Sequence, residues 1–178
     1  ITNVKHLKNL RELYASHNCG ISDKGIDNPK LEILYANYNT KITTVKHLKN
    51  LRELYTNGYC RISDEGIDNP KLEILYANNN RKITTVKHLK NLRELYATGY
   101  CGISDEGFDN PKLEVLNADH NTKITTVKHL KNLRELHASD NCGISDKGLD
   151  NPKLEYLNAD WNKNITTVKH LKNLRELY

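Results

Sequence analysis

The stretch ITTVKHLKNLREL occupies residues 42–54, and the same letters return at residues 83–95, 124–136 and 165–177. Residues 1–13 repeat it with Asn3 in place of the second threonine, so the period is 41 residues. A fixed period of this length is typical of a repeat architecture, in which each unit packs only on its neighbours. We therefore expect one array over residues 1–178, with double units at 1–41, 42–82, 83–123 and 124–164 and a partial unit at 165–178.

Each double unit divides into two related halves. The segments LRELYASHNCGI (10–21) and LEILYANYNTKI (31–42) share the pattern L-x-x-L-x-A-x-x-x-x-x-I. Nine segments of this kind start at Leu10, Leu31, Leu51, Leu72, Leu92, Leu113, Leu133, Leu154 and Leu174. A unit of about 20 residues cannot bury its own apolar face, so successive segments must stack to form a continuous core.

The L-x-x-L motif predicts a short strand with two leucines turned inward, and stacked strands pair in parallel about 4.8 Å apart. The stretches ISDEGIDNPKLE and ITTVKHLKNL return the chain to the next strand. Glycine and Asn-Pro interrupt any long helix there, so short helical or 3₁₀ turns are expected. The fold class is then an α/β solenoid.

The pattern resembles the leucine-rich-repeat family, whose motif is L-x-x-L-x-L-x-x-N/C-x-L, with alanine usually replacing the third leucine here. Halves with Asn39, Asn80, Asn121 and Asn162 resemble internalin-type repeats, and halves with NCGISDKGI or YCRISDEGI resemble cysteine-containing repeats. The cysteine lies one place later than in that second type. No F-box is present, so no ubiquitin-ligase role is implied. The resemblance implies a horseshoe or arc with a concave parallel sheet and short turns on its convex side.

Three ladders of identical residues follow from the stacking. Cys19, Cys60, Cys101 and Cys142 recur in every second segment, roughly 10 Å apart, which is too far for a disulfide or a zinc site. We expect free, buried thiols and, from them, a reducing intracellular compartment. The asparagine column should satisfy backbone groups at the strand ends.

The third ladder contains His6, His47, His88, His129 and His170, each between lysines on the convex side. This basic ridge could meet an acidic partner. The interpretation we favour is a solvated face, partly neutralised by Asp64, Glu65, Asp68 and their equivalents.

Differences between the repeats concentrate on the predicted strands. Counted from the first leucine, positions three, five and seven should face solvent on the concave surface, with position eight at its rim. Tyrosine, tryptophan, histidine and aspartate recur there, which is typical of recognition surfaces, although exposed strand positions could also simply drift. The candidate ligand-binding residues are Tyr14, Tyr35, Tyr55, Tyr76, Tyr96, His120, His137, Asp140 and Trp161.

These features favour a non-enzymatic module that binds another protein or peptide on its concave face. No nucleophile, base and orienting group recur together, and no metal or cofactor site is expected. The net charge of +5 is spread along the chain, a weak argument for nucleic acid, and no apolar run is long enough to span a bilayer. The alternatives are a structural array that self-associates through ends without polar caps, or a consensus array designed without a natural ligand.

Overall fold

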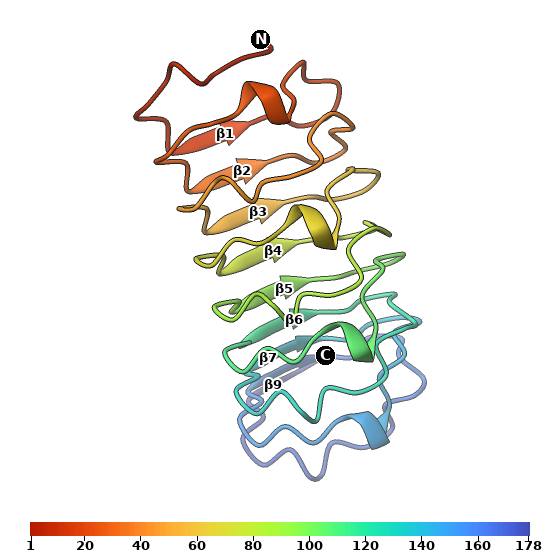
Figure 1. Ribbon diagram of the computed structural model, residues 1–178. Coiled ribbons are helices and arrows are strands. Elements are labelled where there is room, and N and C mark those ends of the chain that lie inside the picture. The colour runs from red at the N-terminus through yellow and green to blue at the C-terminus, as the bar shows by residue number, and fades with distance from the viewer.

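A computed structural model describes all residues 1–178 as a single solenoid built on one parallel sheet. The strands follow one another along the sheet in chain order, so each segment forms one coil and pairs only with the segments before and after it (Figure 1). Adjacent strands pair in register, with Leu54 opposite Leu34 and Leu75. The nine strands are β1 (Glu12–Tyr14), β2 (Ile33–Tyr35), β3 (Glu53–Tyr55), β4 (Ile74–Tyr76), β5 (Glu94–Tyr96), β6 (Val115–Asn117), β7 (Glu135–His137), β8 (Tyr156–Asn158) and β9 (Glu176–Leu177).

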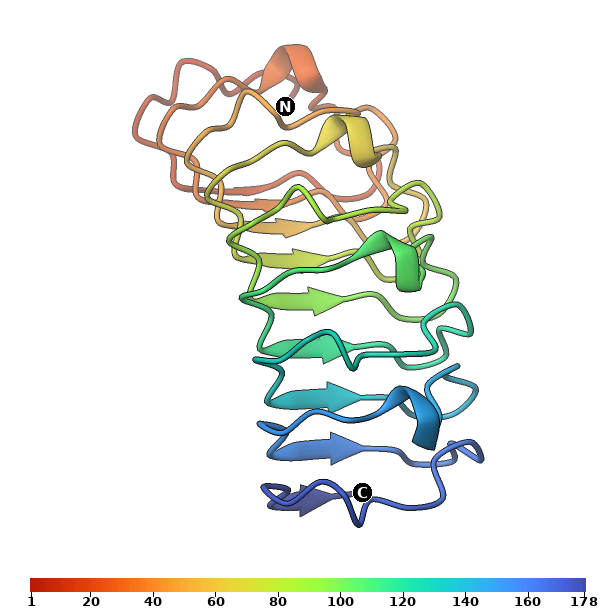
Figure 2. The same ribbon diagram turned by 60° about the horizontal axis from the view of Figure 1, so that its bottom comes forward.

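The return segments contain the only helices, and these are 3₁₀-helices of three residues each. They are η1 (Asp23–Gly25), η2 (Asp64–Gly66), η3 (Asp105–Gly107) and η4 (Asp146–Gly148), and Figure 2 shows them on the side opposite the strands. The other halves return through tight bends, such as Leu48 N–H donating to the carbonyl of Val45. The predicted 3₁₀ turns are thus confirmed, but only for the cysteine-containing halves. None of these helices is long and apolar enough to cross a membrane.

The core lies between the sheet and the return segments. It forms one continuous cluster of 43 buried apolar residues. The two leucines of the strand motif point inward, as Leu51 and Leu54 show, and Ala77 and Ile62 fill the remaining positions. A coil buries these groups only by contacting the coils before and after it, which makes the array a cooperative unit.

Two columns of buried asparagines hold the coils together, and the sequence predicted one of them. Asn80 Nδ2 donates to the carbonyls of Thr56 and Ile62 in the preceding coil, and its Oδ1 accepts from Lys82 N–H. The second column is the asparagine of the Asn-Pro step. Asn69 Nδ2 donates to the carbonyls of Val45 and Leu48, 2.8 and 2.9 Å away. The sequence pattern predicts only a helix break at Asn-Pro and does not reveal this role.

All four cysteines are free, and three are buried in the core, as predicted. Burial raises the pKa of the Cys101 and Cys142 thiols to about 11, and it also raises the pKa of Cys60. Cys19 is only partly buried, because its coil is the first and has no coil packed against its outer side. These thiols pack as small, neutral apolar groups.

Candidate functional site

The outward side of the sheet, here called the strand face, carries a continuous stack of five tyrosines, Tyr14, Tyr35, Tyr55, Tyr76 and Tyr96. Their ring centroids are 4.4, 4.2, 4.3 and 3.9 Å apart in chain order, with planes within 17° of parallel. In-register parallel strands about 4.8 Å apart place identical side chains at nearly the spacing of stacked rings. The structure thus brings together all five tyrosines that the sequence selected.

The stack exposes less ring surface than the sequence predicts. Tyr14 is 69% exposed because only one neighbour covers it, whereas the other four rings are partly buried between neighbours. Ring faces are therefore used within the fold, and ring edges and the acceptor side of the hydroxyl oxygens remain for a ligand.

Three hydroxyls of the stack, those of Tyr14, Tyr55 and Tyr96, have a raised pKa. Tyr14 Oη donates to Glu12 Oε1 at 2.7 Å, and this bond, with a smaller effect from Tyr35, raises the pKa of Tyr14 to about 12. Burial first, and then the neighbouring hydroxyl, raises the pKa of Tyr55 and of Tyr96. The strand face presents these groups as neutral phenols rather than phenolates.

Beyond Tyr96 the same column becomes polar, so the strand face has two chemically different halves. Asn117 follows Tyr96 and ends the stack. His137 Nε2 lies 2.8 Å from Glu135 Oε1, and its ring packs at 5.1 Å against Tyr156. His137 is thus held by its own and the next strand, and it does not contact the tyrosine stack.

Position eight lies just beyond the strand in each of the first eight coils, and its backbone is left-handed throughout. The residues are His17, Tyr38, Gly58, Asn79, Gly99, His120, Asp140 and Trp161, with φ between +57° and +72°. Glycine, asparagine and aspartate tolerate this conformation, whereas for bulky side chains it is a strained outlier. The sequence showed that this position varies but did not reveal its left-handed backbone. The recurrence of Gly58, Gly99 and Asn79 in one column was the signal that could have indicated it.

Trp161 has the least favourable environment of this column. Its φ is +59° and its side chain is 84% exposed, so burial does not offset the backbone strain. Tyr38 differs, because its ring stacks on His17 at 5.1 Å and covers Gly58. Backbone strain that packing does not offset is often found at binding sites.

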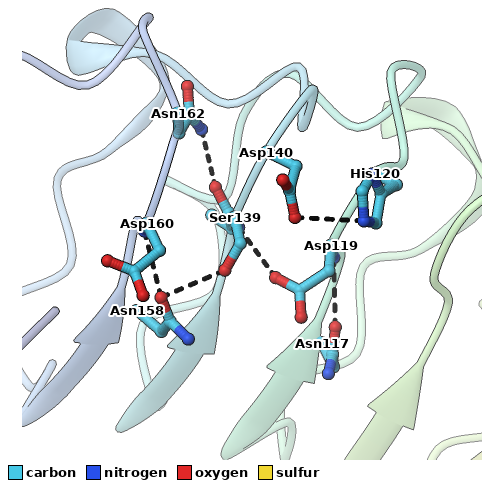
Figure 3. Close-up of polar contacts among 9 residues, drawn as sticks. Asn117, Asp119, His120, Ser139, Asp140, Asn158, Asp160 and Asn162 are labelled. Atoms are coloured by element: carbon cyan, nitrogen blue, oxygen red, sulfur yellow. Dashed lines mark hydrogen bonds and ion pairs between the residues drawn. The ribbon is translucent and has the colours of Figure 1, made fainter.

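Figure 3 shows the polar cluster at the carboxyl edge of β6–β8, the edge at which the strands end. His120 Nε2 lies 3.0 Å from Asp140 Oδ2 of the neighbouring coil. Asp119 Oδ1 accepts from Ser139 N–H at 2.7 Å. Asp160 lies one coil further, with its backbone N–H bonded to Asn158 Oδ1. The structure thus brings His120 and Asp140 together and leaves Trp161 one coil away.

The acidic side chains of this cluster do not form a metal site. No group of three or more histidine, cysteine, aspartate or glutamate side chains converges closely enough to hold an ion. The carboxylates are instead spread along the edge, one in each coil, where they can pair with cations on a ligand.

The arginines at the strand starts are bound within the fold. Arg52 pairs with Glu73 at 2.6 Å and Arg93 with Glu114 at 2.8 Å, each between neighbouring coils. Arg11 and Arg134 make the equivalent pairs. This amino-terminal side of the sheet offers few unpaired charges to a partner.

The ridge of lysines and histidines on the return side also has structural contacts. His47 Nε2 lies 2.9 Å from the carbonyl oxygen of Ile26, and His88 makes the same contact with Ile67 at 2.7 Å. Of the acidic residues beside it, Asp64 accepts hydrogen bonds from the backbone of Thr84 and Thr85. These contacts favour the interpretation of the ridge as a solvated, internally bonded face.

No family model matches the chain, and a search of curated proteins finds no match.

Proposed function

We propose that this chain is a non-enzymatic recognition module that binds another protein or peptide across the strand face and the carboxyl edge of β6–β8. We further propose that its coils are leucine-rich repeats of alternating internalin-like and cysteine-containing type. The parallel coils of 20 or 21 residues and the buried asparagine column support this classification.

The observation that carries the binding proposal is Trp161. A large aromatic side chain in a left-handed backbone, 84% exposed, costs conformational energy and exposes apolar area without being buried in the core. Asn79 occupies the same position in another coil and suits that backbone better. Tryptophan is among the side chains that contribute most to binding at protein interfaces.

The two halves of the surface indicate the kind of ligand. Tyrosine hydroxyls and ring edges line β1–β5, and Asp119, Asp140 and Asp160 follow at the edge of β6–β8. An extended peptide with a basic segment would meet carboxylates at one end and tyrosines at the other. Its interface would include the candidate residues selected from the sequence.

A random-peptide library selected against the immobilised chain tests the proposal, because the selection requires no identified partner. Selected peptides are measured against the parent and against Trp161→Asn, which keeps a residue suited to the left-handed backbone. A second variant changes Tyr35, Tyr55 and Tyr76 to phenylalanine, which keeps the stack and removes the hydroxyls. The control is Lys90→Ser on the return side.

We expect the selected peptides to be basic, and their affinity to fall by roughly tenfold for Trp161→Asn, which is about 1.4 kcal/mol for one interface anchor. Lys90→Ser should bind like the parent. Peptides that bind all four proteins equally, or that lose affinity only with Lys90→Ser, would place the binding surface elsewhere.

A further inference from the structure

A separate hollow lies at the carboxyl edge of β2–β5, next to the residues of the proposed protein-binding surface. Its volume is about 210 Å³, and it is lined by Tyr38, Gly58, Tyr59, Asn79, Arg81 and Tyr100. Gly58 is essential to its shape, because a Cβ there would lie 2.2 Å from the Tyr38 ring. The hollow is smaller than the roughly 300–1,000 Å³ of sites that enclose drug-sized ligands, so it suits a single ring.

Two tyrosines of this hollow are largely exposed. Tyr59 is 79% exposed and Tyr100 is 72% exposed, so neither ring contributes much to the core. The equivalent positions in the first and fourth double units are Asn18 and Asn141, which shows that this position does not require an aromatic ring. The rings are therefore available to stack on a ligand.

Unpaired cations lie in the same edge segments as these rings. The edge segments 37–41, 57–61, 78–82 and 98–102 contain four cations and no acidic residue, namely Lys41, Arg61, Arg81 and Lys82. None of them forms an ion pair, in contrast to the strand arginines, which pair with glutamates. This edge therefore has a local excess of positive charge, although the net charge of the chain as a whole is spread along its length.

Arg81 links the cations to the rings. Its guanidinium carbon lies 5.0 Å from the centre of the Tyr100 ring, a cation–π contact that positions the charge over an aromatic face. Arg81 and Tyr100 also line a second hollow of about 370 Å³ together with His120 and Lys123. Stacking surfaces and cations therefore alternate along the edge.

We propose that this edge binds nucleotide units of a single-stranded nucleic acid, with bases stacked on Tyr59 and Tyr100 and phosphates held by Arg61, Arg81 and Lys82. Exposed rings interleaved with unpaired cations are how proteins bind single strands without sequence preference. An acidic peptide fits less well, because it would use the cations and leave the rings of Tyr59 and Tyr100 without flat partners.

The edge also limits the length of nucleic acid that can bind. Coils two to five span three strand spacings, or roughly 14 Å. Asp119, Asp140 and Asp160 lie at the same edge in coils six to eight and would repel phosphates. The site therefore takes a short segment, and the two proposed surfaces lie side by side with opposite charge.

Fluorescence anisotropy with a labelled short oligo(dT) and a labelled oligo(rU) tests the proposal. The variants are Tyr59→Asn with Tyr100→Asn, Arg81→Thr and Arg61→Gly, each introducing the residue that this chain itself has at an equivalent position. Lys90→Ser on the return side removes one positive charge elsewhere and is the matched control. Competition with thymidine monophosphate, and with a glutamate-rich peptide, separates the possible ligands.

We expect the double tyrosine variant to bind roughly tenfold to a hundredfold more weakly, as loss of two base-stacking surfaces predicts. Arg81→Thr and Arg61→Gly should weaken binding and reduce its salt dependence, whereas Lys90→Ser should change neither. Displacement by thymidine monophosphate at similar concentration would identify a single nucleotide as the bound unit. No binding at low salt, an equal loss with Lys90→Ser, or equal displacement by the acidic peptide would each overturn the proposal.

Discussion

The side-chain amide of Asn121 donates to the carbonyl oxygen of Ala97, 2.8 Å away and 24 residues earlier in the chain. The same amide reaches the carbonyl of Ile103 at 3.3 Å, and Asn121 Oδ1 accepts from Lys123 N–H at 2.9 Å. One side chain thus satisfies three backbone groups in two neighbouring coils, and its contacts with the two carbonyls are buried. Leaving a buried backbone group unpaired destabilises the folded state.

Replacing Asn121 with alanine should therefore lower the free energy of unfolding by about 2–4 kcal/mol, since buried carbonyls lose their donor. Urea unfolding followed by circular dichroism measures this change. Asn141, which is exposed, provides the control: Asn141→Ala should change stability by less than about 0.5 kcal/mol. Equal effects of the two substitutions would show that the asparagine column is not a main source of stability.

Trp161→Asn should raise the free energy of unfolding, by roughly 1 kcal/mol, because asparagine tolerates the left-handed backbone at φ +59° better than tryptophan does. Chemical denaturation of parent and variant under identical conditions gives the difference. A stability gain accompanied by loss of peptide binding would fit a residue retained for recognition. A clear loss of stability would instead show that Trp161 packs against the fold.

The tyrosine stack should contribute to stability through its rings rather than its hydroxyls. Tyr76 lies 4.3 Å from Tyr55 and 3.9 Å from Tyr96, so Tyr76→Ser removes two stacked pairs. We expect a loss of about 1–3 kcal/mol, taking 0.5–1.5 kcal/mol for each pair. Tyr76→Phe keeps both pairs and should be nearly neutral in the same urea titration. Similar losses for both variants would assign the effect to the hydroxyl.

Alkaline pH should destabilise the fold through the same stack. The pKa of Tyr14 is raised to about 12, and those of Tyr55 and Tyr96 are also raised, whereas an unfolded tyrosine titrates near pKa 10. The unfolded chain then releases protons that the folded chain keeps, so this contribution is complete below about pH 10 and is lost as the pH rises above it.

Urea unfolding at increasing pH, with absorbance near 295 nm to follow phenolate formation, measures this effect. Replacing Tyr55 and Tyr96 with phenylalanine should reduce the slope of stability against pH above about pH 10. An unchanged slope would mean that other groups control the alkaline transition.

The cysteines should divide into one accessible thiol and three protected ones. Cys19 is partly exposed, whereas Cys60, Cys101 and Cys142 are buried, and burial raises the pKa of the last two to about 11. A thiol-specific reagent near neutral pH should label Cys19 in the folded chain, and the other three only on unfolding. In Cys19→Ser, rapid labelling should disappear. Fast labelling of a buried cysteine would reveal local opening of its coil.

The repeated sequence motif by itself determined the architecture. L-x-x-L at intervals of 20 and 21 residues allows one arrangement that buries both leucines of every segment, so the parallel sheet, the inward leucines and the Asn121 column follow from periodicity. The same regularity predicted the free cysteines, since a column such as Cys60 and Cys101 cannot bring its members together.

Only the tertiary structure decided what the varied residues do. The distance between neighbouring strands decides whether the Tyr76 ring is exposed to a ligand or stacked on other tyrosines. The strain at Trp161 depends on its backbone φ angle, which the sequence does not specify. The contact of Arg81 with Tyr100 joins residues from neighbouring coils at the sheet edge. Periodicity specifies which residues share a column, but side-chain direction and local φ specify which of them meet across columns, and these are set by packing.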